Sequence, residues 1–193
     1  MLTVKRAEEI LKETETLLTG HFLLTSGRHS DKYMQCAKVL QYANHAEELL
    51  KDIADDFAND KIDVVVAPAT GGIIVGYELS RQLKCKNIFA ERENGKMTIR
   101  RGLEIEKGAR VLVAEDVTTT GGTVFEIMDL VKKIGAEVVG VALLVDRSMG
   151  KVDFKVNTKS AYVADVVSWE ADECPLCKEG KLPAIKPGSR GLK

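Results

Sequence analysis

The chain has 193 residues, the length of one domain that can bury a substantial core. Hydrophobic residues make up 45% and charged residues 30%, proportions that exclude a disordered or fibrous chain. The 28 basic and 29 acidic side chains leave a net charge of -1, so the molecule as a whole is not attracted to nucleic acid or anionic membranes.

The sequence contains no sign of export or membrane insertion. No apolar run reaches the ~18–20 residues that a membrane span needs, and the charged stretch from Met1 to Lys12 is unlike a signal peptide. We therefore expect a cytoplasmic protein. The cysteines are too few and too scattered for a disulfide framework, so we expect reduced thiols. They are Cys36, Cys85, Cys174 and Cys177.

The first forty residues predict one helix and two short extended segments. Apolar residues recur at helical spacing over residues 4–18, which predicts an amphipathic helix. Residues 22–24 and 33–36 then predict strands on either side of a polar loop that includes the turn at 25–28.

From residue 44 onward the chain alternates helices with continuous apolar strands. A helix is expected from Asn44, which resembles an N-terminal cap paired with Glu47, to Phe57. Further strands are expected at 62–67, 111–114 and 138–145, with helices over 74–83 and 124–134. This alternation is typical of an α/β fold with a parallel sheet covered on both faces.

A charge-dense segment interrupts the alternation between Glu91 and Lys107. It has no helical period, so we expect an exposed, mobile loop or hairpin. The end of the chain is punctuated by proline and glycine and includes the motif Cys-Pro-Leu-Cys at residues 174–177.

The most informative segment is residues 111–123, VLVAEDVTTTGGT. Glu115 and Asp116 are adjacent carboxylates at the carboxyl end of a predicted buried strand, and their mutual repulsion is better explained by a ligand than by a structural role. The Thr/Gly turn that follows opens a helix, where free backbone amides and the helix dipole favour a phosphate. The alternative is a plain strand-to-helix connection with a threonine cap.

Two other phosphate motifs are missing from the sequence. It has neither the lysine of a P-loop nor the Gly-x-Gly-x-x-Gly of a dinucleotide fold. Carboxylates that contact sugar hydroxyls directly before a phosphate cradle instead suggest a ribose 5-phosphate ligand.

Residues 115–123 resemble the phosphoribosyl pyrophosphate signature of type I phosphoribosyltransferases. Three further segments resemble the orotate phosphoribosyltransferase branch of that family: residues 20–27, the pair Asp146-Arg147, and the Cys-Pro-Leu-Cys tail with residues 186–190. The resemblance covers essentially the whole chain. It implies transfer of ribose 5-phosphate from phosphoribosyl pyrophosphate to orotate, giving orotidine 5-monophosphate and pyrophosphate in pyrimidine (UMP) biosynthesis.

The resemblance also implies the type I phosphoribosyltransferase fold, a parallel sheet flanked by helices with a small hood made from both ends of the chain. We expect a single domain over residues 1–193, with the hood at about 1–43 and 170–193 and the core at about 44–169.

Carried over position by position, the resemblance assigns the donor site. Residues 67–72 match the pyrophosphate loop, for which an ordinary tight turn is the alternative. The catalytic residues implied are Glu115, Asp116, Arg92 and Lys96. Phosphoribosyl pyrophosphate would be bound by Glu115, Asp116, Val117, Thr118, Thr119, Thr120, Gly121, Gly122, Thr123, Thr70, Gly71 and Arg92.

The resemblance assigns orotate to Thr119 and Arg147. A guanidinium is a planar, charge-assisted partner for the carboxylate of orotate. The alternative for Arg147 is a surface ion pair with Asp146.

Two departures from the family pattern concern basic residues. Thr25 stands where the family often has a lysine, and no histidine lies in the segment that matches the mobile catalytic loop. Arg92 matches the first basic position of that loop and Lys96 matches loosely. Two more residues are candidates by charge alone, with a solvated face as the alternative; they are Arg100 and Arg101.

The implied cofactor is Mg2+ carried with phosphoribosyl pyrophosphate, because this cation prefers oxygen ligands and commonly arrives with phosphate. We assign no metal site to the protein itself. Cys174 and Cys177 could supply two zinc ligands, but a structural site needs about four. Pairing of two tails in a dimer is the alternative to a zinc-free tail that packs on the core. The histidines lack metal-ligand spacing; they are His21, His29 and His45.

The resemblance implies a homodimer in which the mobile loop of one subunit closes over the site of the other, with no nucleic-acid or membrane partner. Two other functions stay open: the same transfer to a purine base, against which Arg147 argues, and a non-catalytic regulator built on this fold, against which the lack of net basic charge argues.

Overall fold

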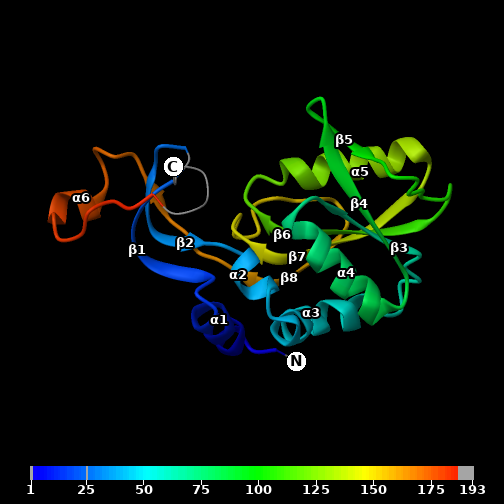
Figure 1. The fold of residues 1–193 in the computed structure, drawn as a ribbon, viewed down its shortest axis with the longest axis horizontal. Coiled ribbons are helices and arrows are strands. Elements are labelled where there is room, and N and C mark those ends of the chain that lie inside the picture. Colours follow the sequence, from blue (N-terminus) through cyan, green and yellow to red (C-terminus); the bar gives the residue numbers. More distant parts are fainter. Residues whose placement is uncertain (1, 25, 187–193) are drawn as a thin grey trace.

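The computed structural model of the protein describes residues 2–24 and 26–186. These residues form two sheets, one of six strands and one of three (Figure 1). None of the helices in this part of the chain has the length and apolar character needed to cross a bilayer.

The six-stranded sheet confirms the predicted parallel α/β arrangement. Its strand order is β5-β4-β3-β6-β7-β8, and all neighbours are parallel except the edge pair β4 and β5. The strands are β3 (Val64–Pro68), β4 (Lys86–Glu93), β5 (Lys96–Ile99), β6 (Arg110–Thr118), β7 (Glu137–Asp146) and β8 (Asn157–Val163).

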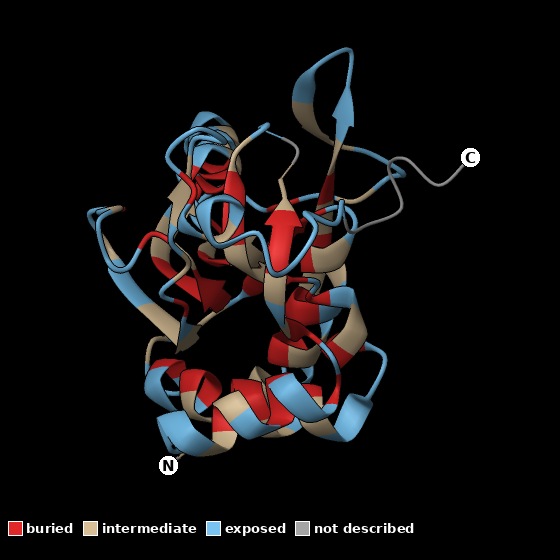
Figure 2. Ribbon diagram, turned by 90° about the vertical axis from the view of Figure 1, so that its left-hand side faces the viewer, coloured by how far each residue is buried: buried red, intermediate tan, exposed pale blue. Residues whose placement is uncertain are grey.

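Helices cover both faces of this sheet because successive residues of each strand point to opposite sides. One core cluster contains alternate residues such as Val65 and Leu112, which pack with α1, α2, α3 and α4. The other contains Val64 and Val111, which pack with α5. The helices are α1 (Val4–Glu13), α2 (Ala37–Leu40), α3 (Ala43–Phe57), α4 (Gly71–Leu83) and α5 (Gly122–Ile134). Figure 2 shows the buried residues along the strands and the inner helix faces.

Two predicted helix boundaries are wrong. The first helix ends at Glu13 instead of continuing to residue 18, because the Thr14 hydroxyl donates to the Ile10 carbonyl at 2.7 Å and Glu15 takes a φ of 54°. The expected cap of the second helix is also absent. That helix begins at Ala43, and the residue before it makes no side-chain capping bond.

The three-stranded sheet joins the two ends of the chain. It consists of β1 (Leu17–Leu23), β2 (His29–Met34) and β9 (Ser168–Trp169) in the order β1-β2-β9. The predicted extended segments at 22–24 and 33–36 overlap the first two strands only at their ends, because β1 already starts at Leu17 and β2 at His29. A short helix, α6 (Pro175–Glu179), follows β9 and lies beside the small sheet, away from the large one (Figure 1).

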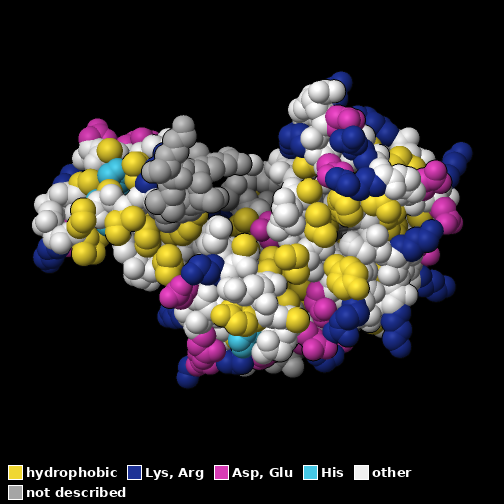
Figure 3. All heavy atoms as spheres, in the orientation of Figure 1, with side chains coloured by type: hydrophobic (Ala, Val, Ile, Leu, Met, Phe, Trp, Pro, Cys, Tyr) yellow, Lys and Arg dark blue, Asp and Glu magenta, His cyan; other side chains and the backbone are white. Residues whose placement is uncertain are grey.

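The charge-dense segment folds as the hairpin of β4 and β5, in agreement with the predicted loop or hairpin. Two of its basic residues pair with acidic residues of the same segment: Arg100 with Glu93 at 3.3 Å and Arg101 with Glu91 at 2.8 Å. The hairpin projects from the edge of the large sheet, where Lys and Arg side chains gather (Figures 1 and 3).

Candidate active site

Three neighbouring parallel strands, β3, β6 and β7, end at the same edge of the large sheet. Thr118 and Asp146 are register partners, so the next residues, Thr119 and Arg147, leave the sheet side by side. The backbone amide of Arg147 donates to the Thr118 carbonyl at 2.9 Å. Such strand ends are where open α/β sheets bind ligands.

The acidic pair lies at the end of β6, as the sequence predicts. Glu115 is 7% exposed, and its Oε1 accepts the Asp116 amide at 3.1 Å. Asp116 is less buried, and its Oδ1 accepts the Val117 amide at 2.9 Å. Burial raises the pKa of Glu115 well above its usual range, and the hydrogen bond and charge of Asp116 add to the effect. A cationic ligand beside Glu115 and Asp116 would reduce the repulsion between their two carboxylates.

The Thr/Gly turn forms a pocket of about 230 Å³ between β6 and α5. Gly121 caps α5 with a φ of +77°, and a Cβ there would lie 2.7 Å from Val152 Cγ1. Glycine at position 121 therefore permits a tight turn at the N-terminus of α5. The free backbone amides and the dipole of that helix favour binding of an anion there. The pocket is lined by Glu115, Val117, Thr118, Thr119, Thr120, Gly121, Gly122, Thr123 and Glu126.

The loop after β3 packs directly against the acidic pair. A Cβ on Gly71 would lie 2.1 Å from Asp116 Oδ2, and one on Gly72 would lie 3.2 Å from Glu115 Oε1. Thr70 precedes α4 and is exposed. The structure therefore brings together the loop at 69–72 and the segment at 115–123, which are far apart in the sequence.

Arg147 is half-buried, and its Nε has no hydrogen-bond partner in the structure. Burial lowers the pKa of this guanidinium, which the neighbouring Cys36 and Tyr33 oppose. The alternative ion pair with Asp146 is wrong, because the Asp146 carboxylate instead accepts two backbone amides, from Ser148 at 2.7 Å and Gly150 at 3.0 Å. The guanidinium therefore lies at the sheet edge with an Nε–H group that is free to donate to a ligand.

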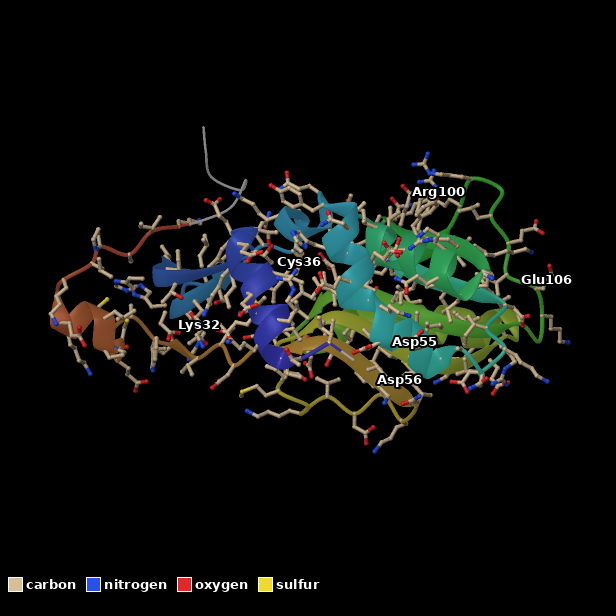
Figure 4. The ribbon with its side chains drawn as sticks, turned by 90° about the horizontal axis from the view of Figure 1, so that it is seen from below. Lys32, Cys36, Asp55, Asp56, Arg100 and Glu106 are labelled. Atoms are coloured by element: carbon tan, nitrogen blue, oxygen red, sulfur yellow. The ribbon has the colours of Figure 1, made fainter. Side chains whose placement is uncertain are left out.

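Cys36 marks the junction of the small sheet with the site. It lies two residues beyond the end of β2, at the N-terminus of α2, and its Sγ lies 3.7 Å from the Asp116 carbonyl oxygen. Figure 4 shows Cys36 between the small-sheet end of the molecule and the large sheet. Residues from the N-terminal hairpin therefore reach the acidic pair.

Arg92 connects the β4–β5 hairpin with the pocket. Its Nη1 donates to the Gly95 carbonyl at 2.7 Å and its Nη2 to Glu126 Oε1 at 3.1 Å. Glu126 lies on α5 and lines the pocket, a role that no sequence motif indicates. Lys96 is exposed at the start of β5.

Thr25, where the family often has lysine, lies outside the described residues, as does most of the 186–190 segment.

Comparison with known proteins shows the family to which this chain belongs. The phosphoribosyl transferase domain family matches residues 37–173. The chain is 55% identical to the orotate phosphoribosyltransferase of Caldicellulosiruptor bescii, over 94% of this chain and 95% of the relative. It is 53% identical to that of Caldanaerobacter subterraneus subsp. tengcongensis, over 95% of this chain and 96% of the relative. The chain belongs to the orotate phosphoribosyltransferase family.

The fold of this chain is also similar to the folds of solved phosphoribosyltransferase structures. The crystal structure of orotate phosphoribosyltransferase from Aeropyrum pernix aligns with a TM-score of 0.67 at 27% identity, covering 80% of this chain and 92% of that one. An adenine phosphoribosyltransferase from Thermoanaerobacter pseudethanolicus aligns with a TM-score of 0.60 at 19% identity, covering 69% of this chain and 88% of that one, and shares the fold alone. As an orotate phosphoribosyltransferase family member, the chain is a pentosyltransferase.

The buried acid predicts a stability that depends on pH. Because the pKa of Glu115 is raised on folding, the folded chain keeps a proton that the unfolded chain releases above its usual pKa of about 4.3. Stability therefore falls as pH rises above that value, until Glu115 ionises in the folded state. Glu115→Gln should remove this loss, so the variant gains stability over wild type between pH 5 and 8, by up to about 1.4 kcal/mol per pH unit.

Urea unfolding at several pH values would measure this effect without ligand. Glu106→Gln, which changes an exposed carboxylate, serves as the control and should show no such trend. A stability difference between Glu115→Gln and wild type that does not vary with pH would contradict the assignment.

Proposed function

We propose that the site transfers ribose 5-phosphate from phosphoribosyl pyrophosphate to N1 of orotate. The C1–O bond to pyrophosphate breaks, the C1–N1 bond forms, and N1 gives up its proton, yielding orotidine 5-monophosphate. The observation that carries this proposal is the meeting, at one sheet edge, of a pocket at a helix N-terminus, two carboxylates and an unpaired arginine nitrogen.

The donor takes the deeper part of the site. Its 5-phosphate lies in the pocket of Thr118–Thr123, and Val117 continues that lining. Glu115 and Asp116 contact the ribose hydroxyls. The pyrophosphate approaches the backbone of Thr70 and Gly71, because glycine leaves those amides accessible.

Mg2+ fits this arrangement by donor chemistry. The carboxylates of Glu115 and Asp116 offer the oxygen atoms that magnesium prefers, and the ion keeps several waters and arrives with phosphate. When bound, it neutralises charge on the departing pyrophosphate. Glu115 and Asp116 are the residues that would hold it.

The protein's own residues stabilise the changing charge. The ribose becomes oxocarbenium-like as its bond to pyrophosphate breaks, so Asp116 stabilises it more in the transition state than in the ground state. Arg92 and Lys96 neutralise the pyrophosphate and exclude water, which would otherwise hydrolyse the donor. Arg92 is held by Glu126, 3.1 Å away at the pocket rim.

Orotate is recognised by Thr119 and Arg147. Arg147 donates to the orotate carboxylate, a planar and charge-assisted match for a guanidinium with an unpaired Nε. A purine base has no carboxylate for this arginine, so the purine-base alternative is disfavoured. Relatives at 55% identity that are named as enzymes likewise disfavour a non-catalytic regulator.

A direct turnover assay tests this function. Purified protein is incubated with magnesium, phosphoribosyl pyrophosphate and orotate, and the loss of orotate absorbance is followed. A parallel series with adenine, guanine and hypoxanthine separates the base specificities. Turnover of a purine base but not of orotate would overturn the proposal.

The division into a hood of about 1–43 and 170–193 and a core of about 44–169 stays part of the proposal. The three-stranded sheet of β1, β2 and β9, which is separate from the six-stranded sheet, supports this division. Cytoplasmic location and the absence of nucleic-acid and membrane partners are also proposed, on the near-neutral charge of the chain.

A homodimer is supported by an apolar face on α4. Tyr77 and Ile74 are 66% and 44% exposed. Tyr77 also lines a groove of about 520 Å³ with Phe89 and Leu103. Figure 3 shows hydrophobic side chains gathered over α4 on the viewer's side. A second copy of the chain would cover this face and bring its hairpin close to the neighbouring site.

Subunit mixing tests whether the sites are shared. A chain with Arg92→Ala and Lys96→Ala keeps the donor loop, and a chain with Glu115→Gln and Asp116→Asn keeps the hairpin. Each homodimer should be nearly inactive. After joint unfolding and refolding in equal amounts, half the dimers are mixed and each has one intact site of two, so about a quarter of wild-type activity should return.

The alternative outcome is equally informative. The contact between Arg92 and Glu126 lies within one chain, so a hairpin that serves its own subunit would give no recovery. No activity in demonstrated mixed dimers would therefore refute the shared site and leave the transfer reaction itself untouched.

A further inference from the structure

A cluster of four metal-binding side chains lies far from the sheet edge that forms the active site. His21 is on β1, His29 begins β2, Cys174 caps α6, and Cys177 lies in the first turn of α6. One nitrogen or sulfur atom from each lies within 4.8 Å of all the others. Residues separated by about 150 positions in the sequence therefore meet at one point.

The distances in the cluster match those of a tetrahedral zinc site. With Zn–N of about 2.0–2.1 Å and Zn–S of about 2.3 Å, a ligand nitrogen and a ligand sulfur lie about 3.5 Å apart. His21 Nε2 is 3.6 Å from each of the two cysteine sulfurs, and His29 Nδ1 is 3.2 Å from Cys177 Sγ. The two nitrogens are 2.8 Å apart and need to separate by about half an ångström to bind one ion.

The ring of His21 is oriented for this role by a second hydrogen bond. Its Nδ1 lies 2.8 Å from the Leu182 carbonyl, which can only accept, so Nδ1 carries the proton and Nε2 presents a lone pair to the cluster. Metal-binding histidines are commonly held by such a bond from their other nitrogen.

The cluster is also shielded from water. His21 and His29 are 3% and 8% exposed, and Cys174 is fully buried, so only Cys177 reaches the surface. Among the described residues the four side chains contact one another and the Leu182 carbonyl, and a single ion at their centre would bind all four at once.

The backbone holds the ligand pairs in place. Cys174 caps α6, Pro175 opens it, and the two residues between the cysteines give a spacing typical of zinc-binding pairs. The tail then returns to β1, where the Ile185 amide donates to the His21 carbonyl at 2.9 Å and the Leu23 amide donates to the Ile185 carbonyl at 2.8 Å.

We propose that His21, His29, Cys174 and Cys177 bind one zinc ion as a structural site. Four protein ligands close the coordination sphere and leave no position for water or substrate, which distinguishes a structural site from a catalytic one. Thiolate and imidazole donors favour zinc over magnesium or calcium. The ion would fasten the C-terminal segment to the N-terminal hairpin.

This proposal replaces the sequence-based expectation that the chain has no metal site of its own. That expectation rested on spacing along the chain, which cannot show that a hairpin brings two histidines to the cysteine pair. The proposal does not depend on the reaction assigned above, because none of its tests measures turnover.

Metal content is the first test. Full-length protein, dialysed after purification in zinc-containing buffer, should carry about one zinc per chain by elemental analysis. Cys177→Ser, chosen because Cys177 is exposed and its loss leaves the core intact, should lose most of that zinc. Two controls outside the cluster should keep it: Cys85→Ser and His45→Gln.

Cobalt supplies a signature that a loosely bound ion does not reproduce. Protein stripped of metal and reloaded with Co2+ should show the intense visible absorption of a tetrahedral ion and a near-ultraviolet thiolate band, both reduced in Cys177→Ser. Zinc should also raise the Tm of wild type but not of that variant. A wild-type chain that binds neither ion at micromolar concentration, or a Cys177→Ser chain that keeps both the zinc and the tetrahedral spectrum, would overturn the proposal.

Discussion

Replacement of Arg147 with alanine is expected to raise the KM for orotate far more than the KM for phosphoribosyl pyrophosphate. The change removes the guanidinium whose Nε is unpaired in the structure, and in the proposed complex it takes away the partner of the orotate carboxylate. Loss of one partner of a buried charge pair typically costs ~2–5 kcal/mol, which corresponds to roughly thirtyfold to several thousandfold in binding. Steady-state kinetics with each substrate varied in turn would measure both constants.

Two further variants refine the result. Arg147→Lys keeps the charge but loses the planar fork, so it should recover only part of the affinity for orotate. Arg6→Ala serves as the control, because Arg6 on α1 pairs with Glu48 on α3 at 2.8 Å and lines neither the site nor the groove on α4. Equal increases in both KM values for Arg147→Ala would contradict its assignment to orotate.

The second large effect is expected from Asp116→Asn, which keeps the shape of the side chain and removes its charge. The carboxylate matters most as the ribose becomes cationic, so kcat should fall more than either KM rises. Removal of one such electrostatic contact typically lowers kcat by about 10²–10³-fold. Asn can still accept the Val117 amide that Asp116 accepts at 2.9 Å, which limits the structural change.

Asp153→Asn is a matched control, because Asp153 is an exposed carboxylate that pairs with Lys155. It should leave kcat unchanged. Circular dichroism and the Tm of each variant would show that folding is retained. An Asp116→Asn protein that is folded and turns over at the wild-type rate would remove Asp116 from the catalytic group.

The fold was predictable wherever hydrophobic pattern and local turn chemistry agreed. The apolar runs that became β3, β6 and β7 were recognised because they are buried on both faces. β4 and β8 were missed, since Lys86–Glu93 carries charges at both ends and Asn157–Val163 has no fully buried residue. Leu17 and Leu18 were assigned to the first helix because a strand start and a helix end can carry the same apolar residues.

The site was predictable as far as its motifs are continuous in the sequence. Residues 115–123 form the expected strand, turn and helix start, and Arg147 stands beside Thr119 as the parallel register requires. The pairing of Arg92 with Glu126 depends on how the hairpin packs on α5, and the meeting of His21 with Cys174 depends on the return of the tail. Neither contact has a local signature.

The close approach of Gly71 to Asp116 makes the residue allowed at position 71 depend on the residue at position 116. Since a methyl group at residue 71 would fall 2.1 Å from Asp116 Oδ2, no larger residue fits there while the aspartate keeps its place. A smaller residue at position 116 would open that space but would remove the carboxylate. A substitution at residue 71 therefore requires the Asp116 side chain to rotate away or to be lost, so a position without a side chain is constrained by the carboxylate beside it.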